Sequence, residues 1–282
     1  MKKLMSLLLT LVLTISCTVL LAGCGAQKSK KIKVVDVALT AESYAYAVKK
    51  ENTALLESVN ELLTEMKANG KLDQLINKYF DGNATFTYTN PTSKEGCLVV
   101  ATNAFFPPFE YYEGNKLTGV DMEIASLLAE KVGKTLYIAD MEFDSVLASL
   151  TSDTADIAMA GLTVTEERKK TYAFSQEYYE SAQVLMTTED VKEFDGKTAD
   201  EIVEILKKKN MKYTIGTQQG TTGYMYSHGD EDFGYDGFTN LNTTVYPNGT
   251  LAAMDLKNGK INAVIIDKQP AIMIAKNINN AN

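Results

Sequence analysis

The nine residues Ala160-Gly161-Leu162-Thr163-Val164-Thr165-Glu166-Glu167-Arg168 complete and follow a short apolar run that begins at Ile157. The run predicts a buried strand, and polar groups follow the end of that strand. Thr165 is a favourable helix N-cap, and Glu166 and Glu167 suit the first turn of a helix. The stretch therefore predicts a strand, a polar loop and a helix, with Arg168 in the first helical turn.

Arg168 is the single arginine among the 28 basic residues of this 282-residue chain. The helix dipole disfavours a cation in the first turn unless an anion pairs with it. The planar guanidinium fork binds a carboxylate through two parallel hydrogen bonds, which a lysine ammonium cannot do. Spacing alone leaves two interpretations. Arg168 either binds a ligand carboxylate, or it is exposed or paired with Glu166 or Glu167.

Strand-like and helix-like segments alternate on both sides of this stretch. Short apolar runs predict strands at residues 33–37, 44–48, 98–102, 135–138, 157–160, 213–216 and 263–266. Apolar residues at the helical period predict helices at residues 54–67, 121–131, 145–150, 199–209, 251–258 and 269–276. The alternation predicts α/β layers with mostly parallel sheets.

Polar groups also follow three other predicted strands, at the carboxyl ends where open α/β sheets bind ligands. These groups are Asn103 after residues 98–102, Gln218 and Thr222 after residues 213–216, and Asp267 after residues 263–266. Asp267 is either the N-cap of the next helix or the partner of a ligand cation. Phe106 and Phe143 are either core residues or walls of a binding site.

The composition argues against several classes of function. A net charge of −8 argues against a nucleic-acid-binding protein, which usually carries a basic patch. The single histidine, His228, excludes a site with several histidine ligands, and its polar surroundings predict a surface position. No phosphate-binding loop motif occurs. We expect no metal and no cofactor.

Residues 1–24 have the pattern of an export signal. Lys2 and Lys3 precede an apolar run over residues 4–21, which ends in Leu21-Ala22-Gly23-Cys24. The alternative is a transmembrane anchor, since about 18 apolar residues can span a bilayer. The ending resembles the lipobox of bacterial lipoproteins, in which the cysteine is lipidated. We expect a signal peptide at 1–23, a tether at 24–30, and an anchor on the outer face of the cytoplasmic membrane. Cys97 then lacks a disulfide partner and is predicted to be buried.

Several stretches together resemble the family-3 extracellular solute-binding proteins, the amino-acid-binding components of bacterial ABC importers. The stretches are residues 101–110 (ATNAFFPPFE), 119–124 (GVDMEI), 160–168, 174–179 (FSQEYY) and 220–223 (GTTG), together with Asp267. The resemblance implies a type II periplasmic-binding-protein-like fold. In that fold, two α/β lobes are joined by two hinge crossings, and the ligand lies in the cleft between them.

The resemblance also implies a role for each residue of the site. Arg168 binds the α-carboxylate of an amino acid, helped by the backbone N–H groups of Thr163 and Thr222. The Gly161 carbonyl, the Thr163 hydroxyl and the Asp267 carboxylate hold its α-ammonium group. The side-chain pocket is lined by Asn103, Phe106, Phe143 and Gln218. Because this pocket lacks an obvious charge, we expect a polar uncharged amino acid, with a basic one or cystine next.

The order of the chain departs from the family pattern. The segment at residues 34–80 resembles the end of family members, yet here it precedes the opening strand at 98–102. This predicts a circular permutation, in which a linker at 81–96 joins the usual termini. The expected parts are lobe 2 (31–37 and 185–282), hinge crossings (38–42 and 181–184) and lobe 1 (43–180). Lys31 and Asn282 are then expected to lie close together. The alternative is a damaged gene with a misplaced fragment.

Three functions fit these features. The first is a membrane-tethered monomer that captures a free amino acid and delivers it to an ABC permease. The second is an enzyme on the same fold, similar to the dehydratases that resemble this family. Glu110 is the nearest candidate acid or base for it, unless it is a plain surface or loop carboxylate. The third is a sensory or accessory ligand-binding lipoprotein without a transporter. We expect a binding protein and not an enzyme.

Overall fold

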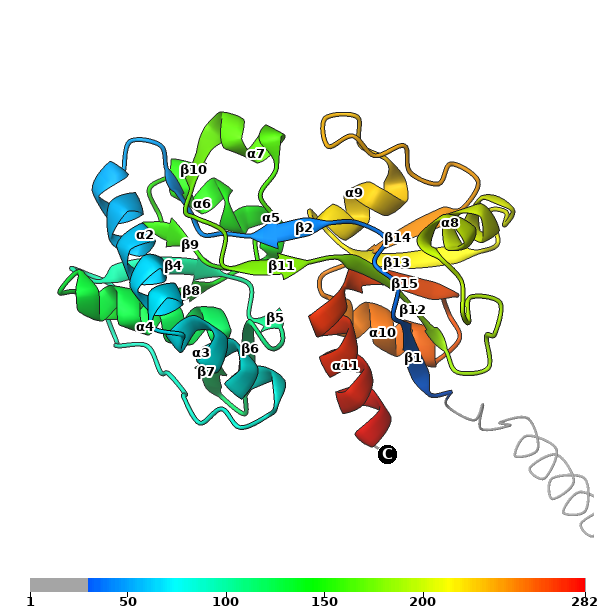
Figure 1. Cartoon of the computed structure of the whole chain (residues 1–282), viewed down its shortest axis with the longest axis horizontal. Helices are drawn as coiled ribbons and strands as arrows, with labels where there is room; N and C mark the ends of the chain where they lie inside the picture. The colour runs from blue at the N-terminus through cyan, green and yellow to red at the C-terminus, as the bar shows by residue number, and fades with distance from the viewer. Residues whose placement is uncertain (1–29, 282) are drawn as a thin grey trace, which may run out of the picture.

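The computed structural model describes residues 30–281 as two lobes that lie side by side, joined by two extended segments (Figure 1). The predicted signal peptide, the predicted lipidation site Cys24 and most of the predicted tether lie outside these residues, as does Asn282. Within the described part of the chain, none of the helices combines the length and the apolar character needed to span a bilayer.

Lobe 1 is built on a five-stranded sheet. In spatial order its strands are β10 (Tyr172–Phe174), β3 (Ala47–Lys49), β9 (Ile157–Ala158), β4 (Leu98–Thr102) and β8 (Leu136–Asp140). Its helices are α2 (Thr53–Ala68), α3 (Lys71–Phe80), α4 (Val120–Lys131), α5 (Phe143–Val146), α6 (Ala148–Thr151) and α7 (Glu166–Thr171). A small sheet of β5 (Phe105–Phe106), β6 (Glu110–Glu113) and β7 (Lys116–Thr118) follows the carboxyl end of β4.

Lobe 2 has a second five-stranded sheet. In spatial order its strands are β1 (Ile32–Val35), β12 (Gln183–Thr188), β15 (Ala263–Asp267), β13 (Thr214–Gln218) and β14 (Asn242–Tyr246). Its helices are α8 (Ala199–Lys207), α9 (Thr222–His228), α10 (Gly249–Lys257) and α11 (Lys268–Asn280). Because β1 precedes lobe 1 in the chain, lobe 2 is assembled from two separate parts of the sequence.

Local patterns explain the main elements. In α2, the buried residues Leu55, Val59, Leu62, Leu63 and Met66 recur at the helical period, so one face packs into lobe 1. Helix α3 has the same kind of pattern in its buried residues, yet it is missing from the predicted helices. Every residue of β4 is buried because strands flank it on both sides and helices cover the sheet. The end of β4 is therefore fixed in place, and Asn103 follows it.

Two chain segments form one antiparallel ribbon that passes through both lobes. The pairs are β1 with β12 in lobe 2, β2 (Glu42–Tyr44) with β11 (Tyr179–Ser181) between the lobes, and β3 with β10 in lobe 1. The two segments cross between the lobes in opposite directions. For this reason, half of the neighbouring strand pairs in each large sheet are antiparallel.

Two predictions are corrected by this ribbon. The mostly parallel sheet is wrong for the half of each sheet that contains the ribbon, whereas β4, β8 and β9 are parallel as predicted. The run at residues 44–48 is also not one strand. It is divided between β2, which ends at Tyr44, and β3, which begins at Ala47, because the chain enters lobe 1 at this point. Periodicity alone does not reveal such a division.

Residues 81–97 contain no helix or strand, and they are held against lobe 1. Asn90 donates to the Ile138 carbonyl and accepts from the Ile138 N–H, at 2.7 and 2.8 Å. Tyr88 exchanges two backbone hydrogen bonds with Leu117, at 2.7 and 3.0 Å. The segment therefore covers backbone groups along the free edge of β8, which protects an edge strand from pairing with other chains.

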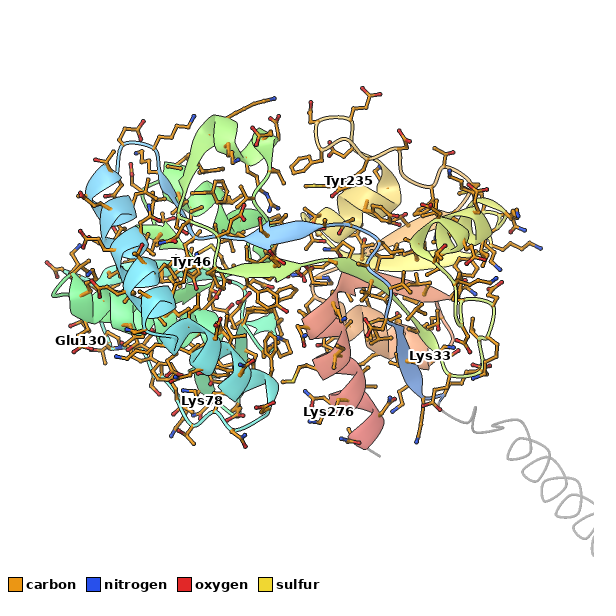
Figure 2. All side chains as sticks on the ribbon, in the orientation of Figure 1. Lys33, Tyr46, Lys78, Glu130, Tyr235 and Lys276 are labelled. Carbon is orange, nitrogen blue, oxygen red and sulfur yellow. The ribbon has the colours of Figure 1, made fainter. Side chains whose placement is uncertain are left out.

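The two ends of the described chain meet on lobe 2. The Ile32 N–H donates to Asn279 Oδ1 at 3.0 Å, and Asn279 Nδ2 donates to the Ile32 carbonyl at 2.8 Å. Helix α11 thus lies beside β1 (Figure 1). Lys33 of β1 and Lys276 of α11, both labelled in Figure 2, lie on this lobe. The expected proximity of Lys31 and Asn282 involves a residue outside the described part.

Candidate functional site

A cavity lies between the lobes, where the carboxyl ends of strands from both sheets face one another. The cavity is narrow in this structure, with a volume of about 10 Å³, which is roughly the room needed by one water molecule. Lobe 1 lines it with Asn103, Phe106, Phe143, Gly161, Thr163 and Arg168, and lobe 2 lines it with Gln218, Thr221, Thr222 and Asp267. All nine site residues expected from the sequence are thus brought to one cavity, and Thr221 is added to them.

Arg168 lies in the wall of this cavity and is 8% exposed. Thr165 caps α7 by accepting a hydrogen bond from the Arg168 N–H at 3.1 Å, so the helix begins where it was predicted. Glu166 and Glu167 form ion pairs with the lysines three residues further on. The interpretation in which Arg168 is exposed or pairs with these glutamates is therefore wrong.

The Arg168 guanidinium contacts both lobes. Nη1 donates to the Thr163 carbonyl of lobe 1 at 2.7 Å, and Nη2 donates to the Gly220 carbonyl of lobe 2 at 3.3 Å. Within residues 30–281, no carboxylate lies within ion-pair distance of it, 4.0 Å. Burial lowers the pKa of Arg168 to about 10. A buried cation without a close anion is costly, so this cavity favours an anionic group.

Asp267 lies on the opposite, lobe 2 side of the cavity. It occupies the N-cap position of α11, yet its side chain makes no capping hydrogen bond, so the cap interpretation is wrong. Its Oδ1 instead accepts hydrogen bonds from the hydroxyls of Tyr44 and Ser181, at 2.5 and 3.3 Å. Burial, and then the negative charge of Glu42, raise the pKa of Asp267 to about 7. A cation in the cavity would stabilise its ionised form.

Neutral amides close another part of the cavity. Gln218 Nε2 of lobe 2 donates to Asn103 Oδ1 of lobe 1 at 2.9 Å, while Asn103 Nδ2 donates to the Met141 carbonyl at 2.7 Å.

Gly161 adopts a left-handed backbone with φ of 53°. A Cβ at Gly161 would lie 2.7 Å from the Phe106 ring, so glycine is needed for the ring to line the cavity.

A loop at residues 229–237, which follows α9, also reaches the site. Its Phe233 ring lies 6.0 Å from the Arg168 guanidinium carbon. Tyr235 is labelled on this part of lobe 2 in Figure 2, and its backbone pairs with Asp230 at the base of the loop. Burial, followed by the charges of Glu42 and Asp267, raises the pKa of Tyr235 to about 12. In the sequence, this glycine-containing acidic stretch indicates only a polar surface.

Glu110 is not a residue of the cavity, although it was the candidate acid or base for an enzyme. It is fully buried in lobe 1, so the interpretation as a surface or loop carboxylate is also wrong. Burial and the charge of Asp121 raise the pKa of Glu110 well above its ordinary value. Asp121 Oδ1 accepts from the hydroxyls of Tyr46 and Tyr178, at 3.1 and 2.6 Å. Glu110 and Asp121 therefore belong to the core of lobe 1. This core supports Gly161, whose N–H donates to Asp121 Oδ2 at 3.0 Å.

Two other residues lie outside the cavity, as predicted. His228 is exposed and stacks on Tyr224, with 5.1 Å between the ring centroids. Cys97 is buried and free. Within residues 30–281, no group of histidine, cysteine and acidic side chains is suited to hold a metal ion.

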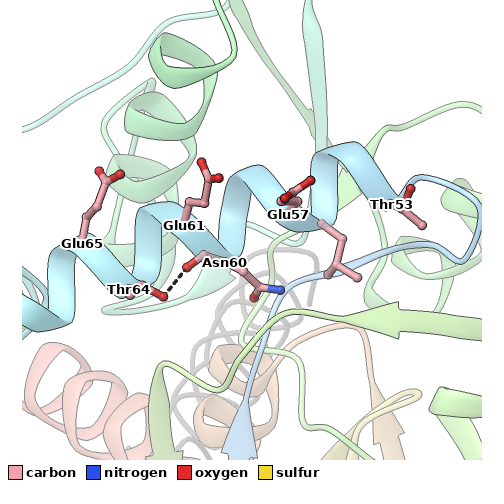
Figure 3. A pocket seen from close by; sticks show the side chains of 7 residues that line it. Thr53, Glu57, Asn60, Glu61, Thr64 and Glu65 are labelled. Atoms are coloured by element: carbon pink, nitrogen blue, oxygen red, sulfur yellow. Dashed lines mark hydrogen bonds between the residues drawn. The ribbon is translucent and has the colours of Figure 1, made fainter.

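A second hollow lies on the outside of lobe 1, along one face of α2 (Figure 3). Glu57, Glu61 and Glu65 recur there every fourth residue, with Asn60 and Thr64 beside them. Lys131 forms ion pairs with Glu61 and Glu65, at 3.3 and 3.0 Å. This hollow is the solvated face of an amphipathic helix, whereas the interlobe cavity gathers buried groups of both charges.

Known proteins match this chain in two separate stretches of its sequence. The sequence profile of the bacterial extracellular solute-binding proteins, family 3, matches residues 14–82 and 98–267. The profile omits residues 83–97, which lie within the segment that covers the edge of β8. The matched residues include all nine expected site residues.

Two curated relatives and one solved structure illustrate the similarity. The arginine-binding extracellular protein ArtP of Bacillus subtilis is 38% identical over 106 residues, which are 36% of this chain and 42% of that protein. The L-cystine-binding protein TcyJ of Escherichia coli K12 is 28% identical over 191 residues, 67% of this chain and 66% of that protein. The matches thus span less than two thirds of either relative. Holo ArgBP from T. maritima has a TM-score of 0.52 at 32% identity, covering 66% of this chain and 75% of that one. All three are binding proteins by name.

Proposed function

Because the chain belongs to the bacterial extracellular solute-binding proteins of family 3, we propose that it captures one free amino acid between its lobes and delivers it to an ABC permease. One observation carries this proposal. Arg168, which has no carboxylate of residues 30–281 within ion-pair distance, and Asp267 are both buried and line the same narrow cavity. An amino acid is a zwitterion, and its two charged groups match these two side chains.

In the proposed complex, Arg168 binds the α-carboxylate together with the backbone N–H groups of Thr163 and Thr222. A guanidinium has five N–H groups, and Arg168 uses two for the carbonyls of Thr163 and Gly220. The α-ammonium group is held by the Gly161 carbonyl, the Thr163 hydroxyl and the Asp267 carboxylate. The support is that these groups line the same cavity from both lobes.

We propose a polar uncharged amino acid as the ligand. Asn103 and Gln218 offer amide donors and acceptors to its side chain. In this structure the two amides hydrogen-bond to each other, and a polar ligand side chain can take the place of either partner. Phe106 and Phe143 offer apolar walls. A basic amino acid and cystine are the next candidates, and the named relatives bind arginine and cystine.

Ligand identity is the most direct test of this function. We expect mass spectrometry of the purified protein to detect one amino acid, and calorimetry with the twenty amino acids to find saturable binding at one site. Polar uncharged amino acids are expected to bind most tightly. Absence of binding by any amino acid or cystine at about 1 mM, a binding free energy of only about −4 kcal/mol, would exclude the proposal.

We also propose that the protein is exported and acts as a monomer anchored to the outer face of the cytoplasmic membrane through Cys24. The charged start, the apolar run and the Leu-Ala-Gly-Cys ending support this. Labelled fatty acid is expected to enter the wild-type protein in cells and to be absent from Cys24→Ala. Equal labelling of both proteins would contradict the anchor.

We further propose that the family order is circularly permuted here, with lobe 2 at 31–37 and 185–282, hinge crossings at 38–42 and 181–184, and lobe 1 at 43–180. The bonds between Ile32 and Asn279 support a connection between 281 and 31. The profile's omission of residues 83–97 supports a junction at that point.

A reordered chain tests the permutation. Residues 97–281, a short glycine-serine linker and residues 31–96 should fold and bind the same ligand, because the edge-covering segment is kept. We expect an affinity within about threefold of wild type, because changes confined to exposed loops cost about 0.5 kcal/mol or less. As a control, new ends placed between Val100 and Ala101 in buried β4 should abolish folding. Failure of the reordered chain to fold or bind would refute the permutation.

A further inference from the structure

Glu42 lies in hinge strand β2, between the lobes, and is 8% exposed. It is not among the residues that line the cavity. Its Oε2 accepts hydrogen bonds from the hydroxyls of Thr163 and Thr222, at 2.7 and 2.8 Å, and from Gln183 Nε2 at 3.3 Å. Its Oε1 accepts from the Thr40 hydroxyl at 2.7 Å. The carboxylate is thus buried behind the cavity, with donors at both oxygens.

The two threonines belong to opposite lobes. Thr163 follows the end of β9 in lobe 1, and Thr222 begins α9 in lobe 2. A single oxygen of Glu42 holds both hydroxyls. Because a hydroxyl has one proton, donation to Glu42 leaves only acceptor lone pairs for other partners. The Thr163 hydroxyl therefore presents only its lone pairs to the cavity. An ammonium group has only donors, so it needs such an acceptor.

We propose that Glu42 is a positioning residue, whose carboxylate orients the hydroxyls of Thr163 and Thr222 and stabilises the closed lobes around the amino acid. This inference rests on the proposed function. When the lobes separate, Thr163 and Thr222 move apart and one oxygen no longer reaches both. The hinge strand thereby couples closure to the geometry of the ligand-binding groups, in addition to joining the lobes.

Replacement by methionine and by glutamine separates this role from a general structural one. Glu42→Met keeps the length of the side chain and removes both acceptors. It is expected to weaken amino-acid binding at least about tenfold, mainly through faster dissociation, since closure retains the ligand. Glu42→Gln keeps one acceptor oxygen for the two threonines, and its amide can donate to the Thr40 hydroxyl. The affinity of Glu42→Gln is expected to stay within about threefold of wild type, which corresponds to a free-energy change of about 0.5 kcal/mol.

Glu180 provides a matched control, because it is an exposed glutamate in the other hinge strand, β11. Glu180→Met should bind as wild type does. Dissociation of radiolabelled amino acid and calorimetry measure the effects, and thermal unfolding of the unliganded variants monitors folding. Where Glu42→Met does not fold, Thr222→Val provides the second variant. It keeps the backbone N–H and the shape of residue 222, and it should also speed dissociation.

Failure of this inference differs from failure of the proposed function. A wild-type protein that binds no amino acid overturns the function before any variant is compared. A binding wild type with an unchanged Glu42→Met overturns the positioning role. A Glu42→Gln variant that is as weak as Glu42→Met also overturns it, because charge would then matter instead of hydrogen bonding.

Discussion

Arg168→Lys is expected to weaken amino-acid binding at least about tenfold, which corresponds to about 1.4 kcal/mol. The lysine ammonium keeps the charge but loses the planar fork that binds both oxygens of a carboxylate. It also cannot reproduce the two bonds that Arg168 makes to the carbonyls of Thr163 and Gly220. Isothermal titration with the identified ligand measures the loss.

A second substitution at the same position separates binding from folding. Arg168→Met is expected to weaken binding more than about a hundredfold, since hydrogen bonds to charged groups contribute about 1.5–3 kcal/mol each. The unliganded Arg168→Met protein should be no less stable than wild type to heat, because an isolated buried cation is replaced by an apolar side chain. Lys169→Met, on the exposed side of α7, is the control and should bind normally. Unchanged affinity in Arg168→Lys would refute the carboxylate role.

Asp267→Asn is expected to weaken binding at least about thirtyfold. Removal of one partner of a buried charge pair costs about 2 kcal/mol or more. In this case the pair is the Asp267 carboxylate and the α-ammonium group of the ligand. The amide keeps the size of the side chain and can still accept from Tyr44 and Ser181, so the fold should be retained. Affinity close to that of wild type would exclude the ammonium role.

The same residue predicts a dependence on pH. In the unliganded protein, burial and Glu42 raise the pKa of Asp267 from 3.8 to about 7. A bound ammonium group favours the ionised carboxylate and lowers this pKa, so the protein binds more tightly once Asp267 has lost its proton. Wild-type affinity should therefore fall about tenfold from pH 8 to pH 6, since one pKa unit corresponds to about 1.4 kcal/mol.

Two comparisons check this assignment. The affinity of Asp267→Asn should change little over the same pH range, and a wild-type affinity that rises as the pH falls would contradict the sign.

The stability of the unliganded fold depends on pH in the opposite direction. A raised carboxyl pKa contributes stability that is complete below the unfolded pKa, near 3.8, and is lost as the pH rises through about 7.

The sequence predicted the elements whose signals are local. Strand β4 has the predicted bounds, and α2 and α4 begin or end within a residue of theirs. Thr165 caps α7 as its residue type indicates, because capping involves neighbouring backbone groups. Polar residues at strand ends also converge on one cavity, since the carboxyl ends of the strands face the space between the lobes.

Partners that are distant in sequence could not be predicted in this way. The antiparallel ribbon that divides residues 44–48 between two strands arises from pairing with residues 172–181, more than 120 positions away. Glu42 gives no local signal, because its donors Thr163 and Thr222 are distant in the chain and lie in different lobes. Glu110 is buried by tertiary packing, which the surrounding residue types did not indicate.

The sequence by itself determined the α/β elements, the membership in one family and the types of side chain available for a zwitterion. Arg168 was conspicuous as the single arginine, and its first-turn position already favoured an anion. Only the tertiary structure decided that Arg168 is buried with no carboxylate of the described chain close to it, that Asp267 faces the cavity instead of capping a helix, and that Glu42 connects the lobes. The physical reason is that burial and the pairing of charges depend on groups that folding brings together from both lobes, whereas caps and periodicity depend on neighbours along the chain.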